Sequence, residues 1–439
     1  MAAAALELTK EMMDAPEAAG LAAVLDVGVA KTVCLAARRD PVLDMHPERP
    51  LRVLGVGVQT APAIASGKPA DFDACARAIR VAIEEAEMMA GAPIKSVVAC
   101  YSGPGLSARL VRGAARVRGG VITERDVDAA VDAAAKAFPN PQQTFLHVET
   151  LRYSIDEGAP IADPVGKSGK MLAVDACVVT APTEALNALK ACISQAGVRV
   201  EDIVASPYAS ALSVLSAEER ASGALVLDLG AGALTMSVFA AEGLVHCETV
   251  CAGGVRLTRD LAMKLQTSFA AAERVKLAFA AVGGGFDPRE AVQAPRLGPD
   301  GRLEAATTLR GVIADTLTPR LTEMLLAARE RLSRVGMSGE HGPQRAVLVG
   351  GGALIPGVRD LAADVLGMPV RIGQPFELCG FDHGDSGPAY AAAAGMLRLR
   401  LDQPTLEDVD DVALPSLRTV LGAMRSSAGR AWDWLRDNF

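Results

Sequence analysis

Leu225-Val226-Leu227-Asp228-Leu229-Gly230-Ala231-Gly232 is the part of the sequence that decides the fold. It reads as a buried strand that ends in a carboxylate and a glycine turn. Apolar residues then alternate with period two over 234–238, which predicts a second strand rather than a helix. The same order of strand, Asp-x-Gly turn and strand occurs at 22–28 and 32–37, about 200 residues earlier. The repetition predicts a chain built from two related halves.

Three common nucleotide-binding motifs are excluded by their spacing. Gly166-Lys167-Ser168 ends like a Walker A loop, but Ile161 stands where its first glycine belongs. Gly230-Ala231-Gly232 begins like a dinucleotide fingerprint, but Thr235 replaces the third glycine and the next residues alternate like a strand. The motif set of protein kinases is also absent.

The two hairpins still carry groups that suit phosphate and magnesium. Glycine turns can direct backbone N–H groups at phosphate oxygens, and a carboxylate at a strand end can hold Mg²⁺ through its waters. Asp26 and Asp228 stand at these positions, and Gly350-Gly351-Gly352 forms a third turn after an apolar run. For a single hairpin, the simpler explanation of Asp and Gly is that they only end the strand and form the turn. The repeated arrangement with a third glycine turn favours a phosphate site.

Composition narrows the class of protein. The 439 residues carry a net charge of −8, which argues against nucleic-acid binding, because such proteins usually present a basic face. Most of the eight cysteines lie in apolar runs, which favours a reducing compartment such as the cytoplasm. No run of about 18 apolar residues is present, so no membrane-spanning helix is expected.

Several further segments have a recognisable pattern. Thr123 and Asp126 form a capping box that starts a helix before Pro139. Helices are also expected over 270–280, 308–332 and 385–400, and 283–301 is expected to be a surface loop.

The C-terminal segment has an amphipathic pattern behind an acidic, proline-containing stretch. Core packing is the ordinary explanation of an apolar helical stripe. The preceding linker, the aromatic residues and the flanking arginines favour a helix that lies on an anionic lipid surface. The residues expected to contact the membrane are Leu417, Leu421, Met424, Arg425, Trp432, Leu435, Arg436 and Phe439.

A set of longer motifs extends over nearly the whole chain. They include Gly120-Val121-Ile122-Thr123, Asp163-Pro164-Val165-Gly166, Ala209-Ser210-Ala211 with Glu218-Glu219, Asp228 to Gly232, Gly253-Gly254-Val255-Arg256-Leu257-Thr258, Ala272-Glu273 with Lys276, Val349 to Ala353, and Val370-Arg371-Ile372-Gly373. With these motifs the sequence resembles the actin-like ATPases and, within them, the FtsA family of bacterial cell-division proteins.

The resemblance implies an α/β, two-half actin-like (RNase H-like) fold with an inserted small subdomain and a C-terminal amphipathic helix on a linker. The implied divisions are an arm at 1–20, a first half at 21–94 with 173–223 and 385–401, an insert at 95–172, a second half at 224–254 and 341–384, a small subdomain at 255–340, a linker at 402–415 and the terminal helix at 416–439.

The same resemblance implies ATP and Mg²⁺ as ligands. It places Asp26, Gly28 and Lys31 in a first phosphate loop, and Asp228, Gly230 and Gly232 in a second. The two aspartates are the implied metal-binding residues. The implied nucleoside contacts are Glu273, Lys276, Gly350, Gly351 and Gly352. On sequence grounds alone, Glu273 and Lys276 also fit an ordinary surface pair of a helix.

Departures from the family pattern bear on hydrolysis. Val29 and Ala30 stand where hydroxyl residues are usual, and Ala233 and Leu234 replace polar residues of the second loop. The stretch Ser206-Pro207-Tyr208-Ala209-Ser210 offers only short hydroxyls where hydrolysing relatives place Glu or Gln. No catalytic residue is therefore assigned, and nucleotide binding with weak or absent turnover is expected.

The implied function is a cell-division scaffold on the cytoplasmic face of the inner membrane at the division site. Its implied partners are further copies of itself in a polymer, later division membrane proteins, and the tail of the tubulin-like protein FtsZ. That tail is expected to dock on 255–340, where Arg320, Arg329, Arg331 and Arg334 are candidates to receive an acidic peptide, although a solvated charged face is the simpler explanation of these arginines. A small-molecule kinase of the same superfold and a pilus-assembly adaptor remain alternatives.

Overall fold

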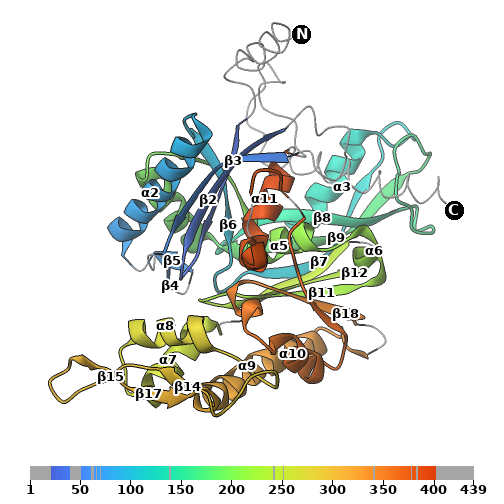
Figure 1. Ribbon diagram of the computed structural model, residues 1–439. Coiled ribbons are helices and arrows are strands. Elements are labelled where there is room, and N and C mark those ends of the chain that lie inside the picture. Colours follow the sequence, from blue (N-terminus) through green and yellow to red (C-terminus); the bar gives the residue numbers. More distant parts are fainter. Residues whose placement is uncertain are drawn as a thin grey trace, which may run out of the picture.

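The computed structural model (Figure 1) describes most of the chain between residues 21 and 401. The described ranges are 21–39, 51–60, 64–65, 67–69, 71–137, 140–240, 243–250, 252–339, 342–376, 378–381 and 384–401. The predicted arm (1–20), linker (402–415) and membrane helix (416–439) lie outside the described residues.

The first sheet has five strands in the order β10-β6-β1-β2-β3. The three strands β1, β2 and β3 form an antiparallel meander, and β6 and β10 add in parallel beside β1. The predicted hairpin is confirmed, with Asp26 opposite Val33. The bounds are β1 Ala22–Val27, β2 Thr32–Arg39, β3 Leu51–Gln59, β6 Ser96–Tyr101 and β10 Arg199–Ala205. A two-residue hairpin, β4 Ile64–Ala65 and β5 Lys68–Pro69, follows β3.

The second sheet repeats this strand order. Its strands run β19-β18-β11-β12-β13, with β11, β12 and β13 antiparallel and β18 and β19 parallel beside β11. The bounds are β11 Ala224–Leu229, β12 Leu234–Ala240, β13 Gly243–Val250, β18 Arg345–Val349 and β19 Val370–Ile372. The two related halves predicted from the repeated hairpin are therefore confirmed.

An inserted sheet extends the second sheet at its β13 edge. Its order is β7-β9-β8, and a single pair, Glu248 with Ser107, joins it to β13. The bounds are β7 Ser107–Arg116, α3 Glu124–Lys136, β8 Gln143–Ile155 and β9 Met171–Pro182. Helix α3 has the predicted capping box. The inserted sheet spans 107–182, not the expected 95–172, because the apolar run of β6 is a parallel strand of the first sheet.

Helices cover both faces of the first sheet. α2 (Phe72–Ala90) and α4 (Thr183–Gln195) share one core with the β1 residues Ala23 and Leu25. α11 (Ala391–Leu401) packs on the opposite face of β1. α5 (Ser206–Val214) contacts α11 and also shares a core with residues of the second sheet, so the two helices lie between the sheets (Figure 1). The short α6 is Ala217–Ser222, and η3 (Gly384–Tyr390) leads into α11.

A lower lobe packs on the other face of the second sheet (Figure 1). Leu225 and Leu227 of β11 share a core with Leu317 and Leu321 of the long helix α9. The bounds are α7 Gly254–Leu265, α8 Phe269–Phe279, α9 Arg310–Arg334, η2 Gly351–Leu354 and α10 Val358–Leu366.

Part of the predicted surface loop in the lower lobe is strand. Two strands lie inside 283–301 and pair with strands that follow it. Their bounds are β14 Ala291–Gln293, β15 Arg296–Leu297, β16 Leu303–Glu304 and β17 Thr307–Leu309. The loop interpretation was incomplete because strands of two or three residues are too short for a periodic pattern. Among the helices described here, none is long and apolar enough to cross a bilayer.

The crossing of α11 over α5 leaves no room for a side chain at Gly395. A Cβ atom at that position would lie 1.8 Å from the carbonyl oxygen of Ala209. We expect Gly395→Ala to lower the free energy of unfolding by about 1–3 kcal/mol, because overpacking outweighs the better helix propensity of alanine. Chemical denaturation followed by circular dichroism measures this.

The matched control is Gly284→Ala. A Cβ atom at Gly284 meets no heavy atom within 4 Å, so this change should alter stability by less than about 0.5 kcal/mol. A Gly395→Ala protein as stable as wild type would contradict the close helix crossing.

Candidate functional site

Two carboxylates lie at corresponding strand ends of the two halves. Asp26 is the penultimate residue of β1, and Asp228 is the penultimate residue of β11. Burial is the main cause that raises the pKa of Asp228 to about 6, and the negative charge of Asp26 adds to it. Burial also raises the pKa of Asp26, against the hydrogen bond from Cys100 and the charge of Lys31. The site therefore brings together two carboxylates whose ionised forms are poorly solvated.

Lys31 supplies a positive charge between the first turn and β2. Its Nζ lies 3.6 Å from the centroid of the Tyr390 ring. Burial lowers the pKa of Lys31, and the charges of Asp26 and Asp228 oppose that shift. One ammonium thus faces two carboxylates.

The two hairpin turns touch each other. In the first turn, the backbone N–H of Gly28 donates to the carbonyl oxygen of Lys31 at 2.9 Å. A Cβ atom at Gly232 in the second turn would lie 2.3 Å from Cγ2 of Val29. Val29, one of the departures from the family pattern, therefore fills the space that a side chain at 232 would need.

The second turn is bound to the start of α7. The backbone N–H of Gly254 donates to the carbonyl oxygen of Gly230 at 3.0 Å, and that of Val255 donates to Ala231 at 2.9 Å. A Cβ atom at Gly253 would lie 2.5 Å from the carbonyl oxygen of Ala231. This close approach of two backbones requires glycine.

Glu273 and Lys276 of α8 lie beside this junction. Their charged groups are 2.8 Å apart, and Lys276 Nζ donates to Thr258 Oγ1 at 2.8 Å. Lys276 Nζ also lies 3.4 Å from the carbonyl oxygen of Gly254. The pair is therefore directed toward the second turn and α7, which distinguishes it from an ordinary solvated pair.

The third glycine turn closes against Asp228. Gly350 has a φ of 81°, and a Cβ atom there would lie 2.2 Å from Asp228 Oδ1. A Cβ atom at Gly352 would lie 2.7 Å from the Leu229 side chain, whereas Gly351 has no heavy atom within 4 Å of that position. The backbone N–H of Gly350 donates to the carbonyl oxygen of Pro388 at 2.8 Å. Apart from Gly351, the predicted nucleotide-site residues are thus joined through these contacts.

Three contributing residues were not predicted as site residues. Cys100 Sγ donates to Asp26 Oδ1 at 3.2 Å, and Ser210 Oγ donates to Asp228 Oδ2 at 3.2 Å. Tyr390 carries the ring below Lys31. Cys100 lies near the end of a strand parallel to β1, and this position in the sequence could have predicted it as a site residue. Tyr390 follows an unremarkable Gly/Pro segment and gives none.

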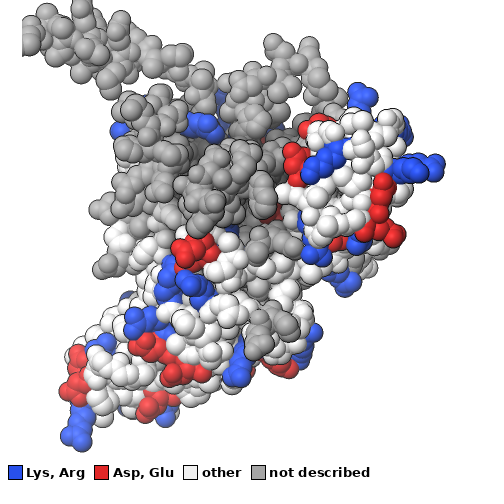
Figure 2. Space-filling model, turned by 90° about the vertical axis from the view of Figure 1, so that its right-hand side faces the viewer, with Lys and Arg blue, Asp and Glu red and all other residues white. Residues whose placement is uncertain are grey.

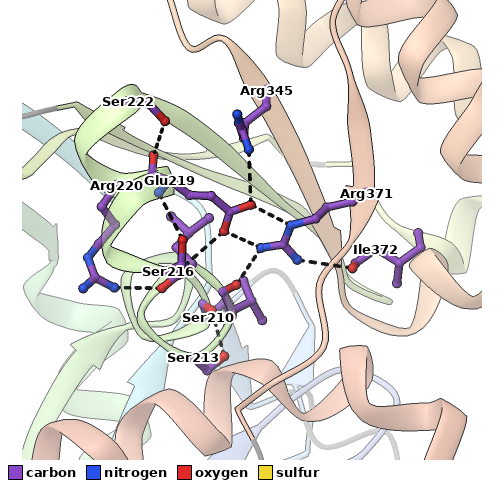
Figure 3. Close-up of polar contacts among 11 residues, drawn as sticks. Ser210, Ser213, Ser216, Glu219, Arg220, Ser222, Arg345, Arg371 and Ile372 are labelled. Atoms are coloured by element: carbon purple, nitrogen blue, oxygen red, sulfur yellow. Dashed lines mark hydrogen bonds and ion pairs between the residues drawn. The ribbon is translucent and has the colours of Figure 1, made fainter. Parts of the chain in front are cut away.

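A polar cluster fixes the C-terminal end of α5, about one turn beyond Ser210 (Figure 3). Arg371 of β19 donates to both carboxylate oxygens of Glu219, at 2.7 and 2.6 Å, and to the carbonyl oxygen of Val214 at 2.7 Å. Ser213 Oγ in turn donates to the carbonyl oxygen of Ser210 at 2.8 Å. The motif residues Glu219 and Arg371 therefore hold α5 and α6 to the second sheet.

At pH 8 we expect Asp228→Asn to stabilise the ligand-free protein, because it removes a poorly solvated charge. Since burial raises the pKa of Asp228 from 3.8 to about 6, the native state gains a proton as pH falls through 6 and wild type recovers stability. The gain should be about 3 kcal/mol at pH 8 and shrink toward pH 4. Denaturation midpoints across this range measure it.

The control is Asp364→Asn at an exposed position of α10. Its stability difference from wild type should not follow the same pH dependence. A less stable Asp228→Asn protein at pH 8 would contradict the electrostatic description of the site.

Two family models match the chain. The model described as "Cell division protein FtsA" matches residues 225–395, and "SHS2 domain inserted in FTSA" matches residues 103–180. The second match coincides closely with the inserted sheet and α3. The insert is therefore an SHS2 domain.

Curated relatives match along almost the full length. The chain is 31% identical to "Cell division protein FtsA" of Agrobacterium fabrum (strain C58) over 425 residues, which cover 95% of both chains. It is 32% identical to the protein of the same name of Rhizobium meliloti (strain 1021), over 95% of this chain and 94% of that protein.

Among solved structures, the "PilM-PilN type IV pilus biogenesis complex" aligns with a TM-score of 0.60 and 19% identity. The alignment covers 88% of this chain and 99% of that chain. At this identity the likeness concerns the fold alone, and it does not favour the pilus-assembly alternative. With its two related sheets and SHS2 insert, the chain belongs to the FtsA family of cell-division proteins, within the actin-like ATPases.

Proposed function

We propose that this cell-division protein binds ATP with Mg²⁺, self-associates into actin-like polymers and tethers FtsZ to the cytoplasmic membrane. The observation that carries the proposal is the convergence of Asp26, Asp228 and Lys31 on three glycine turns. Later division membrane proteins are further proposed partners. Charges of both signs are interspersed over the described part of the face shown in Figure 2, and the net charge is −8, so no nucleic-acid partner is proposed.

The residues present fit ATP and Mg²⁺. Glycine at 232, 253 and 350 lets the turns lie against one another and against Asp228, whereas the Cβ position of Gly351 meets no heavy atom within 4 Å and leaves its backbone open to phosphate or sugar. Asp26 and Asp228 would hold Mg²⁺ through its waters, which would offset their mutual repulsion. The bound metal would neutralise phosphate charge. Lys31 and the turns at Gly28 and Gly230 would hold phosphate oxygens, and Glu273, Lys276 and Gly350 to Gly352 would hold the nucleoside.

Hydrolysis is proposed to be weak or absent. The residue of α5 that contacts Asp228 is Ser210, whose hydroxyl donates its hydrogen bond to that carboxylate. A serine in this position is a poor general base compared with Glu, and its hydroxyl is already used in the hydrogen bond to Asp228. Val29 against Gly232 further supplies an apolar contact where hydroxyl donors are usual in the family.

A cavity in the lower lobe supports the proposed docking of the FtsZ tail. A cavity of about 1260 Å³ follows α9 and is lined by Phe286, Pro319, Leu326 and Ala327 with Asp315 and Glu323 among others. Leu326 is 48% exposed. An apolar groove beside a helix is a common docking surface for a short peptide. We therefore propose that the tail docks within 255–340, along this groove.

The four arginines of α9 are less suited to receive an acidic peptide than the sequence indicates. Arg320 pairs with Asp260 at 2.7 Å, and Arg334 pairs with Glu330 at 2.6 Å. Arg331 pairs with Glu248, and Arg329 donates to the carbonyl oxygen of Val365 at 3.0 Å. Each already has a partner within the protein, so the apolar groove rather than these charges supports peptide docking.

Mg·ATP binding is tested by calorimetric titration of the full chain. We expect wild type to bind, and Asp228→Asn to bind at least about tenfold more weakly although it is the more stable protein, because it loses a metal-binding charge. Acidification through pH 6 should weaken wild-type binding, since protonation of Asp228 competes with the metal.

Asp364→Asn serves as the control and should bind like wild type. Failure of the wild-type protein to bind Mg·ATP would refute the proposed nucleotide site, and turnover above about one per second would contradict the weak-hydrolysis proposal.

Membrane attachment is assigned by sequence to 416–439. We expect a chain truncated before Leu417 to lose co-sedimentation with vesicles that contain anionic phospholipid, because it loses the apolar stripe and its arginines. Trp432→Ser with Leu435→Ser in the full chain should reproduce the loss. Unchanged sedimentation of the truncated chain would contradict the proposed anchor.

A further inference from the structure

Tyr390 forms an unusual contact with the candidate phosphate site. Lys31 Nζ lies 3.6 Å from the centroid of its ring. Within the described parts of the chain, Lys31 Nζ has no hydrogen-bond acceptor or ion-pair partner at contact distance. The face of the Tyr390 ring is therefore its nearest favourable neighbour.

The ring belongs to a segment that is fixed on several sides. Phe381 packs against Tyr390 edge-on, with ring centroids 5.3 Å apart and planes at 84°. In the same segment η3, the carbonyl oxygen of Pro388 accepts from the backbone N–H of Gly350 at 2.8 Å. Tyr390 is the last residue of η3, and α11 begins at the next residue between the two sheets. The ring is thus a fixed surface of the site and not a mobile surface side chain.

The surrounding charges explain why Lys31 needs such a surface. Burial disfavours its ammonium form, and the charges of Asp26 on β1 and Asp228 on β11 favour it. Cys100 on β6 also faces this group of charges through its hydrogen bond to Asp26. A ring face attracts the cation without accepting a conventional hydrogen bond from it. The three N–H donors of the ammonium therefore stay available for strong, charge-assisted bonds to an anion.

We propose that Tyr390 is a positioning residue for Lys31. The ring of Tyr390 holds the Lys31 ammonium in the orientation that meets a phosphate oxygen of the bound nucleotide. The proposal rests on the nucleotide binding proposed above. In this arrangement the ring stays under the ammonium when the phosphate binds. Affinity then depends on a residue that does not itself touch the phosphate.

The experiment separates positioning from mere packing by observing Lys31 directly. Reductive ¹³C-methylation labels lysine amines, and Lys31→Arg identifies the Lys31 signal. In the ligand-free full chain, we expect the Tyr390 ring to shift the Lys31 signal upfield. In Tyr390→Leu the pH midpoint of the Lys31 titration should fall, because the ring no longer favours the ammonium form. The conservative variant Tyr390→Phe, which keeps the ring, should restore both properties.

Mg·ATP affinity of the unlabelled proteins is the second readout. Tyr390→Leu should bind about three- to tenfold more weakly than wild type, and Tyr390→Phe should recover most of the loss. The matched control is Phe376→Leu, which removes a ring whose cationic neighbour is the Arg398 guanidinium, at 5.1 Å, and not Lys31. It should leave the affinity and the Lys31 signal unchanged.

The outcomes are distinct. An unshifted Lys31 signal in wild type overturns the proposal even if Tyr390→Leu fails to fold. Wild-type affinity and an unchanged Lys31 titration in folded Tyr390→Leu overturn it while the proposed nucleotide site stands. A wild-type protein that does not bind Mg·ATP counts against the nucleotide site and the positioning role together.

Discussion

The close crossing of α5 and α11 is the constraint on which the rest of the structure depends. Both helices lie between the two sheets, and the backbone of Gly395 meets the carbonyl oxygen of Ala209 where a side chain would not fit. α5 connects the last strand of the first sheet through α6 to the first strand of the second, so its position sets how the strand ends of both halves meet. Asp26 and Asp228 interact because of this arrangement.

The site itself works against the stability of the ligand-free protein. Two poorly solvated carboxylates face one ammonium, while the glycine turns bring backbone close to the same groups. Strongly shifted ionisable groups of this kind are typical of functional sites, where a ligand supplies the missing compensation. By contrast, Arg371 with Glu219 is a fully matched ion pair at the end of α5 and has a purely structural geometry. The Arg371–Glu219 pair therefore stabilises the fold beside α5, whereas the carboxylates next to the same helix reduce the stability of the ligand-free protein.

Much of the fold could be predicted from local pattern. Alternation after Asp228 predicted the second hairpin, the repeated Asp-x-Gly turn at Asp26 predicted the first, and Thr123 with Asp126 predicted the start of α3. The family resemblance is confirmed as well. The insert boundary was displaced because β6 has the same apolar character whether it lies at a domain edge or in the centre of a sheet. Ser210 and Tyr390 reach the site only through tertiary packing, which no local spacing encodes.

The position of α11 has a consequence for how the chain reaches its native state. This helix ends at Leu401, yet it occupies the interior between the sheets. The insert, by contrast, pairs β7, β9 and β8 with one another within a continuous segment and can form early during synthesis. The two halves cannot close around their centre until α11 has left the ribosome. Folding of the body is therefore completed only after the chain has been made past Leu401.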